Sequence, residues 1–377
     1  MKVAFVGGRG YHSNHGGVEN AVREIASRLA TCPELEVDVY GQGTAPWFAV
    51  NTVAPGLTAV GAPESCSRFE GNAVLALVNC LYALLVRRPR VLVLFASGPS
   101  LLAILARLWR VRVICALRAI DSQRDKWGWL STSVLRLGEI SALRVADACT
   151  VNSLEMYRIY GGEARGLIYI PNGASAASAG SDDVLTGLGL QPDGYLLFAA
   201  RLDPVKRLHL LLQAYRRLPA DCHLPLVVAG GQCTSAAYRL ELEALSGTGV
   251  KFVGHVEGDI LDPLMRNCAL FVLPSILEGM SNSLLAAMHS GRCVLCADVA
   301  ANRDVVQQEA AALFRADDVN DLTRRLTDYC RYPEKRHHCG QIMRQIVNRH
   351  FCWDTTAMQY RDLILRTAGH PTSVAGA

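Results

Sequence analysis

Two successive series of short apolar segments constrain the fold of this chain more than any other feature. The first series comprises KVAFVGG, VDVY, RVLVLF, VRVICAL and ACTVN, and the second comprises YLLFAA, PLVVAGG, VKFVGHV, LFVLPS and CVLCA. A segment of helical length separates each strand-like run from the next. β-Branched runs that alternate with helices are typical of parallel, doubly wound sheets. The sequence therefore predicts an α/β fold made of two Rossmann-like domains with parallel sheets.

The length of the chain and one change in composition favour this two-domain organisation. At 377 residues the chain is too long for one ordinary hydrophobic core. Over residues 170–183 the sequence turns to Gly, Ser and Ala, which is typical of an interdomain linker. We expect an N-terminal domain over residues 1–175, a C-terminal domain over 185–352 and a last helix over 353–370 that packs back on the N-terminal domain. Because an open parallel sheet binds its ligand at the carboxyl ends of its strands, two such domains that face each other place a site in the cleft between them.

Positive charge is concentrated in the first half of the chain. The formal net charge is +4, and the composition of 50% apolar and 19% charged residues excludes a disordered chain. Basic side chains outnumber acidic ones over residues 1–180, whereas the remainder is balanced. The basic residues include two short runs, which are Arg87, Arg88 and Arg90, and Arg107, Arg110 and Arg112. These runs favour contact with an anionic membrane surface, and a solvated helix end and loop is an equally good interpretation.

Cysteine usage and the N-terminal sequence predict a cytoplasmic location. The 13 cysteines are scattered through apolar segments, which is typical of reduced thiols. Cys293 and Cys296 are close in sequence, but strand alternation directs them to opposite faces, which argues against a metal or redox pair. MKVAFVGGRG does not have the pattern of a signal peptide. The most apolar region, 91–117, is interrupted by Gly98, Pro99 and several arginines and is not expected to span a membrane.

The first motif is a glycine-rich segment, GGRGYHSNHGGVENAV (7–22), between the first strand and the first helix. Glycines in this position suit a phosphate or a close backbone approach at a helix N-terminus. The spacing differs from GxGxxG and the loop is longer than a dinucleotide fingerprint, so a flexible turn stays the alternative interpretation. Glu19 either caps the helix or contacts a sugar hydroxyl, and we favour the capping role.

The second motif places two cations in the turn between a strand and a helix. In FAARLDPVKRLHLLLQAY (198–215) these cations are Arg201 and Lys206. Together they suit a diphosphate, because arginine supplies bidentate hydrogen bonds and lysine supplies a point charge. Surface charge at a helix start is the alternative, although the N-terminus of a helix electrostatically disfavours cations. The pair therefore predicts an anion-binding site.

The third motif, LEGMSNSLLAAM (277–288), joins the strand LFVLPS to a helix expected over 283–290. Glu278 and Gly279 are expected to form a turn whose amides suit a sugar hydroxyl or a phosphate. The Glu278 carboxylate suits hydrogen bonds from sugar hydroxyls, and an acidic residue that merely favours a helix N-terminus is the alternative. The residues that offer N-caps to this helix are Ser281, Asn282 and Ser283.

Taken in series, these segments resemble family 4 glycosyltransferases with the GT-B fold. The resemblance covers essentially the whole chain and rests on GGVENAVREIASRLA, IPNGA, ARLDPVKRLHLLLQAY, FVGHV and LPSILEGMSNSLLAAMHSG in this order and spacing. DSQRDKWGWLS (121–131) additionally resembles a subgroup that builds bacterial surface polysaccharides. The resemblance implies retaining transfer of a sugar from a UDP-, GDP- or dTDP-sugar to a glycan or lipid-linked acceptor at the inner face of a membrane. It implies neither a metal nor a separate cofactor, and no nucleic-acid partner.

The resemblance also assigns roles to individual residues. Arg201 and Lys206 would neutralise the leaving diphosphate, whose charge develops in the transition state, and Glu278 would hold the donor sugar. The C-terminal domain would bind the nucleotide-sugar and the N-terminal domain would lie on the acceptor side. The further donor-binding positions are Gly16, Gly17, Gly279, Met280, Ser281, Asn282, Ser283 and Ala286.

Two positions depart from the family pattern. Ala286 stands where the second acidic residue of the E-x7-E pattern binds the nucleotide ribose, and Arg118 aligns with a histidine beside the reacting sugar. Asp121 and the following SQRDKWG anchor that alignment, so the candidate catalytic residues are Arg118, Asp121 and Glu278. One hydrogen bond to a charged group contributes about 1.5–3 kcal/mol, or about 10- to 150-fold in affinity. Ala286 alone therefore weakens donor binding without abolishing chemistry, whereas Arg118 cannot act as a base near neutral pH.

Two other functions stay open on the sequence. Ala286 and Arg118 also fit a catalytically impaired GT-B homologue that serves as a binding or partner subunit. The Rossmann-like halves alone fit a dinucleotide-dependent oxidoreductase. The oxidoreductase is disfavoured, because the first loop lacks the glycine spacing and no acidic residue clearly ends the second strand.

Overall fold

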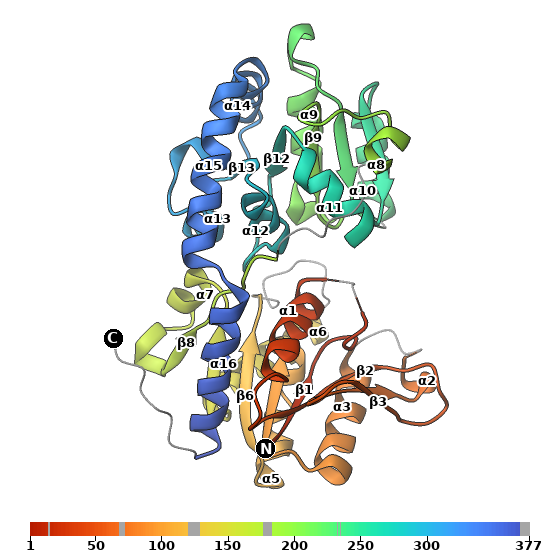
Figure 1. Cartoon of the computed structure of the whole chain (residues 1–377), viewed down its shortest axis with the longest axis vertical. Helices are drawn as coiled ribbons and strands as arrows, with labels where there is room; N and C mark the ends of the chain where they lie inside the picture. The colour runs from red at the N-terminus through yellow and green to blue at the C-terminus, as the bar shows by residue number, and fades with distance from the viewer. Residues whose placement is uncertain are drawn as a thin grey trace. The chain divides into compact units, whose positions relative to one another are not determined.

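The chain forms two compact units (Figure 1). The structure is a computed structural model that describes residues 1–13, 16–67, 72–119, 129–175, 183–231, 233 and 235–369. Unit 1 comprises Met1–Asn172 and Trp353–Ala377, and unit 2 comprises Gly173–Cys352. The C-terminal helix α16 (Trp353–Thr367) thus belongs to unit 1, although the whole of unit 2 precedes it in the sequence. Each unit is built on its own sheet.

Unit 1 contains an eight-stranded sheet in the order β3-β4-β2-β1-β5-β6-β7-β8. Its strands are β1 (Lys2–Val6), β2 (Glu36–Gln42), β3 (Ala49–Ala54), β4 (Leu57–Ala62), β5 (Val91–Phe95), β6 (Arg112–Leu117), β7 (Ala148–Val151) and β8 (Leu167–Tyr169). Neighbouring strands are parallel except β3 and β4, which form an antiparallel hairpin at one edge. The predicted strands β1, β2, β5, β6 and β7 are confirmed. The hairpin and β8 were not predicted, because β3 is an exposed edge strand and β8 has only 3 residues.

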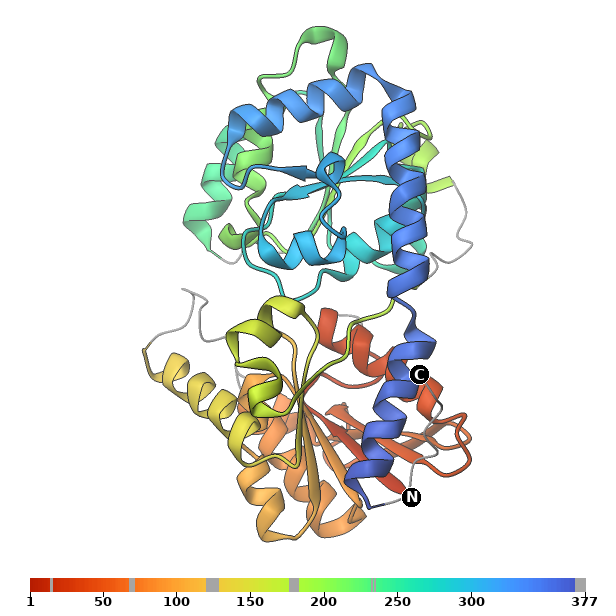
Figure 2. The ribbon, with the colours of Figure 1, turned by 90° about the vertical axis from the view of Figure 1, so that its left-hand side faces the viewer.

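Both faces of the unit 1 sheet are buried, because alternate residues of each strand enter different cores. Val3 and Phe5 of β1 share a core with α1 (Gly17–Leu29) and α16, whereas Ala4 and Val6 enter the opposite core. α1 and α16 lie side by side on one face of the sheet (Figure 2). The other helical segments are α2 (Glu64–Ser67), α3 (Asn72–Tyr82), η1 (Ala83–Arg87), α4 (Ser97–Ser100), α5 (Ala103–Leu108), α6 (Trp129–Arg144), α7 (Leu154–Ile159) and η3 (Gly162–Arg165).

Unit 2 contains a six-stranded parallel sheet in the order β11-β10-β9-β12-β13-β14. Its strands are β9 (Leu196–Ala199), β10 (Leu226–Ala229), β11 (Val250–Gly254), β12 (Leu270–Leu273), β13 (Cys293–Ala297) and β14 (Leu313–Phe314). All of them were predicted except β14, which has 2 residues. The chain adds β10 and β11 on one side of β9 and then β12, β13 and β14 on the other side. The strand order therefore reverses between β9 and β12, and ligands of open α/β sheets bind at the carboxyl ends of strands at such a switch point.

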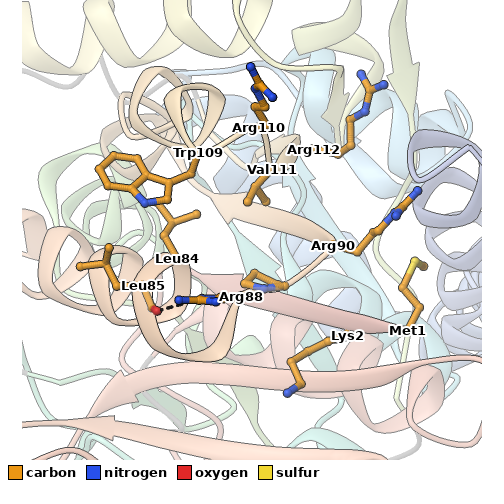
Figure 3. A pocket seen from close by; sticks show the side chains of 11 residues that line it. Met1, Lys2, Leu84, Leu85, Arg88, Arg90, Trp109, Arg110, Val111 and Arg112 are labelled. Atoms are coloured by element: carbon orange, nitrogen blue, oxygen red, sulfur yellow. Dashed lines mark hydrogen bonds between the residues drawn. The ribbon is translucent and has the colours of Figure 1, made fainter.

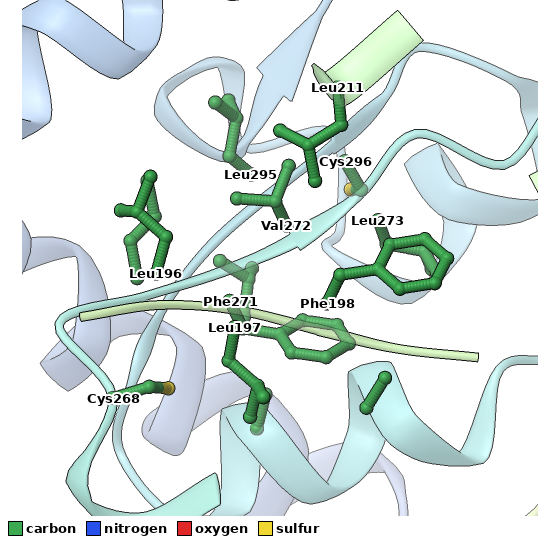
Figure 4. Packing of buried hydrophobic residues seen from close by; sticks show 14 of the residues in the cluster. Leu196, Leu197, Phe198, Leu211, Cys268, Phe271, Val272, Leu273, Leu295 and Cys296 are labelled. Atoms are coloured by element: carbon green, nitrogen blue, oxygen red, sulfur yellow. The ribbon is translucent and has the colours of Figure 1, made fainter. Parts of the chain in front are cut away.

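The core of unit 2 surrounds its central strands. Leu197 and Phe198 of β9 and Phe271 of β12 are fully buried among leucines and valines from the neighbouring strands and helices (Figure 4). No helix in the described part of the chain is long and apolar enough to cross a membrane. The helical segments of unit 2 are α8 (Asp183–Gly187), η4 (Pro204–Lys206), α9 (Leu208–Tyr215), η5 (Ala220–Cys222), α10 (Ala236–Leu245), α11 (Gly258–Asn267), α12 (Asn282–His289), α13 (Ala300–Val305), η6 (Ala310–Ala312), α14 (Val319–Arg331) and α15 (Pro333–His350).

The cysteines contribute to the cores as thiols. All 13 lie within the described residues, and no disulfide joins any two of them. Cys293 lies beside Cys339, and Cys296 donates its Sγ proton to the carbonyl of Ala312 at 3.4 Å. Burial raises the pKa of Cys115 to about 12, which keeps this thiol protonated at neutral pH. Within the described ranges, no group of three His, Cys, Asp or Glu side chains is placed to hold a metal ion.

Candidate functional site

The candidate residues of unit 2 lie at the carboxyl ends of β9 and β12, where the strand order reverses. Arg201 and Lys206 follow β9, and Glu278 follows β12. These two strands are adjacent and parallel, so their carboxyl ends meet at the same edge of the sheet. The structure thus brings together two motifs that lie 72 residues apart in the sequence, counted from Lys206 to Glu278.

The segment that follows β9 is an ordered, capped turn. Asp203 is the N-cap of η4, and its Oδ1 accepts the N–H of Val205 at 3.3 Å. The N–H of Lys206 donates to the carbonyl of Asp203 at 2.8 Å, so the backbone of Lys206 is fixed at the end of the turn. The side chain of Arg201, in contrast, is exposed and makes no hydrogen bond or ion pair with any described residue. One cation is therefore held in place, and the other is available to a ligand.

An ion pair joins the two motifs directly. The Nζ of Lys206 lies 2.5 Å from the Oε1 of Glu278, and the two side chains are 13% and 9% exposed. A backbone hydrogen bond of 3.1 Å from Ile276 to Val205 adds a second link between the same two loops. An ammonium has three donors and a carboxylate has two acceptor oxygens, so each partner keeps hydrogen-bonding capacity for a further group. The pair can therefore contact an anion and a hydroxyl at the same time.

Helix α12 begins just beyond this pair. Ser281 is its N-cap, because the Oγ of Ser281 accepts the N–H of Leu284 at 3.3 Å. The same Oγ lies 3.1 Å from the Oγ of Ser283. Among the three predicted N-caps the structure thus uses Ser281, and the helix spans Asn282–His289 instead of the expected 283–290. Capping by Ser281 fixes the direction in which the helix leaves the sheet edge.

The other residues of this motif differ in their surroundings. Gly279 and Met280 are buried in the turn between Glu278 and the helix. The N-terminus of α12 places the positive end of the helix dipole at the edge that carries the ion pair, which suits an anion. Ala286 lies one turn into the helix, where it is half-buried and packs against the core of unit 2. A methyl group at this position offers no acceptor to a ribose hydroxyl.

Three residues that shape this edge were not singled out in the sequence. Asp203 caps η4, and its D-P pairing with the next residue is a readable signal for a turn. A Cβ on Gly230, after β10, would lie 2.6 Å from a carbonyl oxygen of the β9 loop, so the two loops approach closely only with glycine there. Asn302 of α13 is 1% exposed and donates to the carbonyls of Ala297 and Ser275 at 2.9 and 3.5 Å. No local pattern marks Asn302, because its partners lie at the ends of two different strands.

The glycine-rich motif of unit 1 lies at a second switch point, between β1 and β5. A Cβ on Gly7 would lie 2.2 Å from a carbonyl oxygen of β5, and the φ of Gly7 is +126°, so only glycine fits. Gly16 is the N-cap of α1 with a φ of 139°, and Gly17 is the first helical residue. The Oε1 of Glu19 accepts the N–H of Arg9 at 3.2 Å, so Glu19 holds the glycine-rich loop, and its capping role stays a prediction.

Arg118 follows β6 and is 7% exposed. Its guanidinium donates to the Oδ1 of Asn172 and, at 3.2 Å, to the hydroxyl of Tyr360 on α16. It also lies over the ring of Phe95, 5.3 Å from the ring centroid. The Nε is buried without a hydrogen-bond partner among the described residues. Asp121, the candidate that anchors the alignment of this region, lies outside the described residues.

Part of unit 2 matches a known family model. Residues 193–331 match the family model described as glycosyl transferases group 1. A relative from Escherichia coli, the serotype-specific mannosyltransferase WbdA, is 32% identical over 177 residues, which is 44% of this chain. This match spans only 21% of the length of WbdA.

Solved structures share the fold over nearly the whole chain. Sucrose-phosphate synthase from Thermosynechococcus elongatus has a TM-score of 0.80 and 19% identity, covering 97% of this chain and 98% of that one. Anabaena Alr3699/HepE, solved in complex with UDP-glucose, has a TM-score of 0.76 and 18% identity, covering 97% and 100%. The GT-B architecture expected from the sequence is thus confirmed.

The ion pair makes a prediction about stability. Substitution of Lys206 by Met leaves the carboxylate of Glu278 nearly buried and unpaired, so we expect unit 2 to lose about 3 kcal/mol of unfolding free energy. The double variant K206M/E278Q should recover at least half of this loss, because no uncompensated charge is left. Urea unfolding measures both values. A single variant that is as stable as the double variant would show that the pair is not coupled.

Proposed function

We propose that this protein, a glycosyltransferase of group 1 with the GT-B fold, transfers a sugar from a nucleotide-sugar to a polysaccharide or lipid-linked glycan. One observation carries the proposal, which is the arrangement at the β9/β12 switch point. A fixed ammonium, a fixed carboxylate and an exposed guanidinium lie at one sheet edge beside a helix N-terminus. A nucleotide-sugar presents a diphosphate next to sugar hydroxyls, so it requires cations and a hydrogen-bond acceptor together.

The two cations are proposed to bind the diphosphate. During transfer the bond between the anomeric carbon and the phosphate oxygen breaks, and its electron pair stays on that oxygen. The acceptor hydroxyl oxygen forms the new bond to the same carbon and loses its proton. Arg201 and Lys206 stabilise the charge that grows on the leaving diphosphate. Because these side chains supply the positive charge, the proposed reaction needs no metal ion, and attack from the face of the leaving group gives retention of configuration.

Glu278 is proposed to orient the donor sugar. Its carboxylate accepts hydrogen bonds from sugar hydroxyls with the oxygen capacity that the ion pair leaves unused. The amides of Gly279 to Ser283, at the N-terminus of α12, are proposed to contact the sugar and the distal phosphate. Since Lys206 contacts Glu278 directly, the sugar and phosphate subsites are mechanically one unit.

Unit 1 is proposed to supply the acceptor side. Gly16 and Gly17 have no side chains, so the donor phosphate and the acceptor are proposed to approach the backbone of this loop closely. Asp121 stays a proposed catalytic residue. Arg118 is proposed to stabilise phosphate charge, since a guanidinium cannot accept the acceptor proton near neutral pH. The proton of the acceptor hydroxyl is therefore proposed to pass to the departing diphosphate oxygen, which gains an electron pair on the same face of the sugar.

A second candidate function follows from one observation. The half-buried methyl of Ala286 offers nothing to a ribose, so the nucleotide end of a donor has one anchor fewer than in the family pattern. A chain with a weakened donor site and Arg118 at the histidine position would fit a binding or partner subunit. Brisk turnover by the unmodified protein excludes this candidate.

The place of action is proposed to be the inner face of a membrane. A lipid-linked glycan is anchored in the membrane at its reducing end and grows at the opposite end, and unit 1 carries the positive charge that the sequence concentrates in its first half. Similarity to a mannosyltransferase and to a structure with UDP-glucose makes GDP-mannose and UDP-glucose the first donors to test.

Turnover tests the proposal. Incubation with UDP-, GDP- and dTDP-sugars and with glycan acceptors should release a nucleoside diphosphate from at least one donor. Replacement of Arg201 by Met should lower kcat/KM by about 10- to 150-fold, because one charge-assisted contact to the transition state is lost. Arg216→Met is the matched control, since Arg216 is also exposed and lies on the same unit. An equal effect of both substitutions, or no release from any donor, would contradict the proposal.

Nucleotide affinity tests the departure at Ala286. Substitution of Ala286 by Glu places a carboxylate one turn into α12, where it can accept hydrogen bonds from ribose hydroxyls. We expect the Kd for the preferred nucleoside diphosphate to fall by about 10- to 150-fold, as measured by calorimetry. Ala286→Gln should give a smaller gain, because its amide oxygen is neutral. An unchanged Kd in both variants would place the ribose elsewhere.

A further inference from the structure

A pocket of about 890 Å³ lies at the amino ends of β1, β5 and β6 in unit 1, at the end of the sheet opposite the glycine-rich loop (Figure 3). The proposed reaction does not use this pocket. Its lining includes five cationic side chains, namely Lys2, Arg88, Arg90, Arg110 and Arg112, and no acidic side chain. Figure 3 shows Trp109, Leu84 and Leu85 grouped to one side of these cations.

The cations converge because of the sheet register. Two copies of the pattern R-x-R-V, at 88–91 and 110–113, precede the neighbouring parallel strands β5 and β6. Val91 pairs with Arg112, and the N–H of Arg112 donates to the carbonyl of Arg90 at 3.3 Å. The N–H of Arg90 in turn donates to the carbonyl of Lys2 at 2.9 Å. The three strand starts are therefore linked side by side, and each contributes positive charge to the same pocket.

These cations are poorly neutralised within the described residues. Lys2 and Arg110 make no side-chain hydrogen bond or ion pair there, and Arg88 reaches only the carbonyl of Leu85 at 3.3 Å. Arg90 contacts the carbonyl of Ala368 at 3.2 Å.

Among the described residues, Asp147 is the only carboxylate that contacts any of the five cations. Its Oδ1 lies 2.8 Å from the guanidinium of Arg112. It also lies 2.9 Å from Arg107, so its charge is shared. Arg87 differs from all of them, because it makes a bidentate pair with buried Asp38. Like charges held together without counterions repel one another, and an anionic group bound among them relieves that repulsion.

The backbone also marks these positions. Arg88 has a φ of 50° and Arg110 a φ of 55°, which is the left-handed region that favours glycine. Arginine is strained there in the same way at two equivalent strand starts. A glycine at either position would fit this backbone better, so an Arg→Gly substitution removes the cation without straining the fold.

Apolar side chains extend this surface. Leu85 is 52% exposed, Leu108 is 74% exposed and Trp109 is 43% exposed, and all three lie on or just after η1 and α5, beside the cations. Val86 and Ile104 on the same segments are also exposed. Cations next to exposed leucine and tryptophan side chains are typical of a surface that enters the interface of a bilayer. A nucleic acid would use the cations but would leave these apolar side chains in water.

We propose that this surface docks unit 1 on an anionic phospholipid bilayer, with a headgroup phosphate in the cationic pocket and with Leu85, Leu108 and Trp109 in the interfacial region. The proposal rests on the proposed function, because it gives a surface and a lipid class to the membrane contact named there. It places the membrane at the amino ends of the unit 1 strands, whereas the glycine-rich loop lies at their carboxyl ends.

Vesicle flotation tests the proposal. The full-length protein should float with phosphatidylcholine vesicles that contain 30% phosphatidylglycerol and should not float with pure phosphatidylcholine vesicles. The double variant R88G/R110G should bind the anionic vesicles about 30-fold more weakly, because two cations near the surface are removed. This variant should fold normally, since glycine suits the left-handed backbone at both positions. The charge-matched control R216Q/R315Q alters two exposed arginines of unit 2 and should bind like the unmodified protein.

A second set of variants tests the contribution of the apolar side chains to vesicle binding. L108Q/W109S should lose most of the vesicle binding that persists at high salt, where charge is screened. Leu240→Gln, at a residue of unit 2 that is 60% exposed, should have no effect. Equal losses in both charge variants would overturn the proposal in favour of unspecific attraction. Absence of binding to anionic vesicles, or binding of a poly(U) oligonucleotide instead, would also overturn it.

Donor turnover separates this proposal from the proposed function. R88G/R110G should release nucleoside diphosphate with a soluble acceptor at the unmodified rate, because neither residue belongs to the donor site. If no donor is turned over but the vesicle results hold, the proposed function fails and the docking surface stands. If turnover is found but no variant changes vesicle binding, the docking surface is rejected and the proposed function is kept.

Discussion

The reversal of strand order between β9 and β12 is the constraint on which the candidate site depends. It sets two parallel strands from distant parts of unit 2 next to each other, so the loops that leave them must share one sheet edge. The turn with Lys206, the turn with Glu278 and the start of α12 all take their positions from this arrangement. Packing of the core keeps the strands in register, so the loops at their carboxyl ends can carry the candidate binding residues.

The ion pair between Lys206 and Glu278 converts this shared edge into a single chemical unit. A carboxylate alone would repel a diphosphate, and an ammonium alone would not discriminate a sugar diphosphate from any other anion. Paired, they keep a nearly neutral local charge while each still has hydrogen-bonding capacity. Arg201 then supplies the positive charge that is not balanced by a described residue. The proposed diphosphate would balance the charge of this guanidinium.

The sequence predicted what depends on local pattern and missed what depends on strand order. The apolar runs identified the central strands, and the S-N-S segment identified the cap of α12, because burial and capping act over a few residues. Three contacts join segments that only the sheet brings together. They are the ion pair of Lys206 with Glu278, the hydrogen bonds of buried Asn302 and the hydrogen bond from Arg9 to Glu19. The hairpin β3–β4 was not predicted, because the exposed edge strand β3 has no apolar run that would mark it in the sequence. Resemblance to a family supplied the proposed roles of the site residues, which no local pattern can give.

Calorimetric titration with nucleotides tests the central claim most directly. If the diphosphate is held by Arg201 and Lys206, UDP or GDP should bind at least tenfold more tightly than the corresponding monophosphate at the same ionic strength. The difference should shrink in the Arg201→Met variant, in which one of the two cations is gone. Equal affinities for diphosphate and monophosphate, or no binding of either, would contradict the assignment of this sheet edge as the donor site.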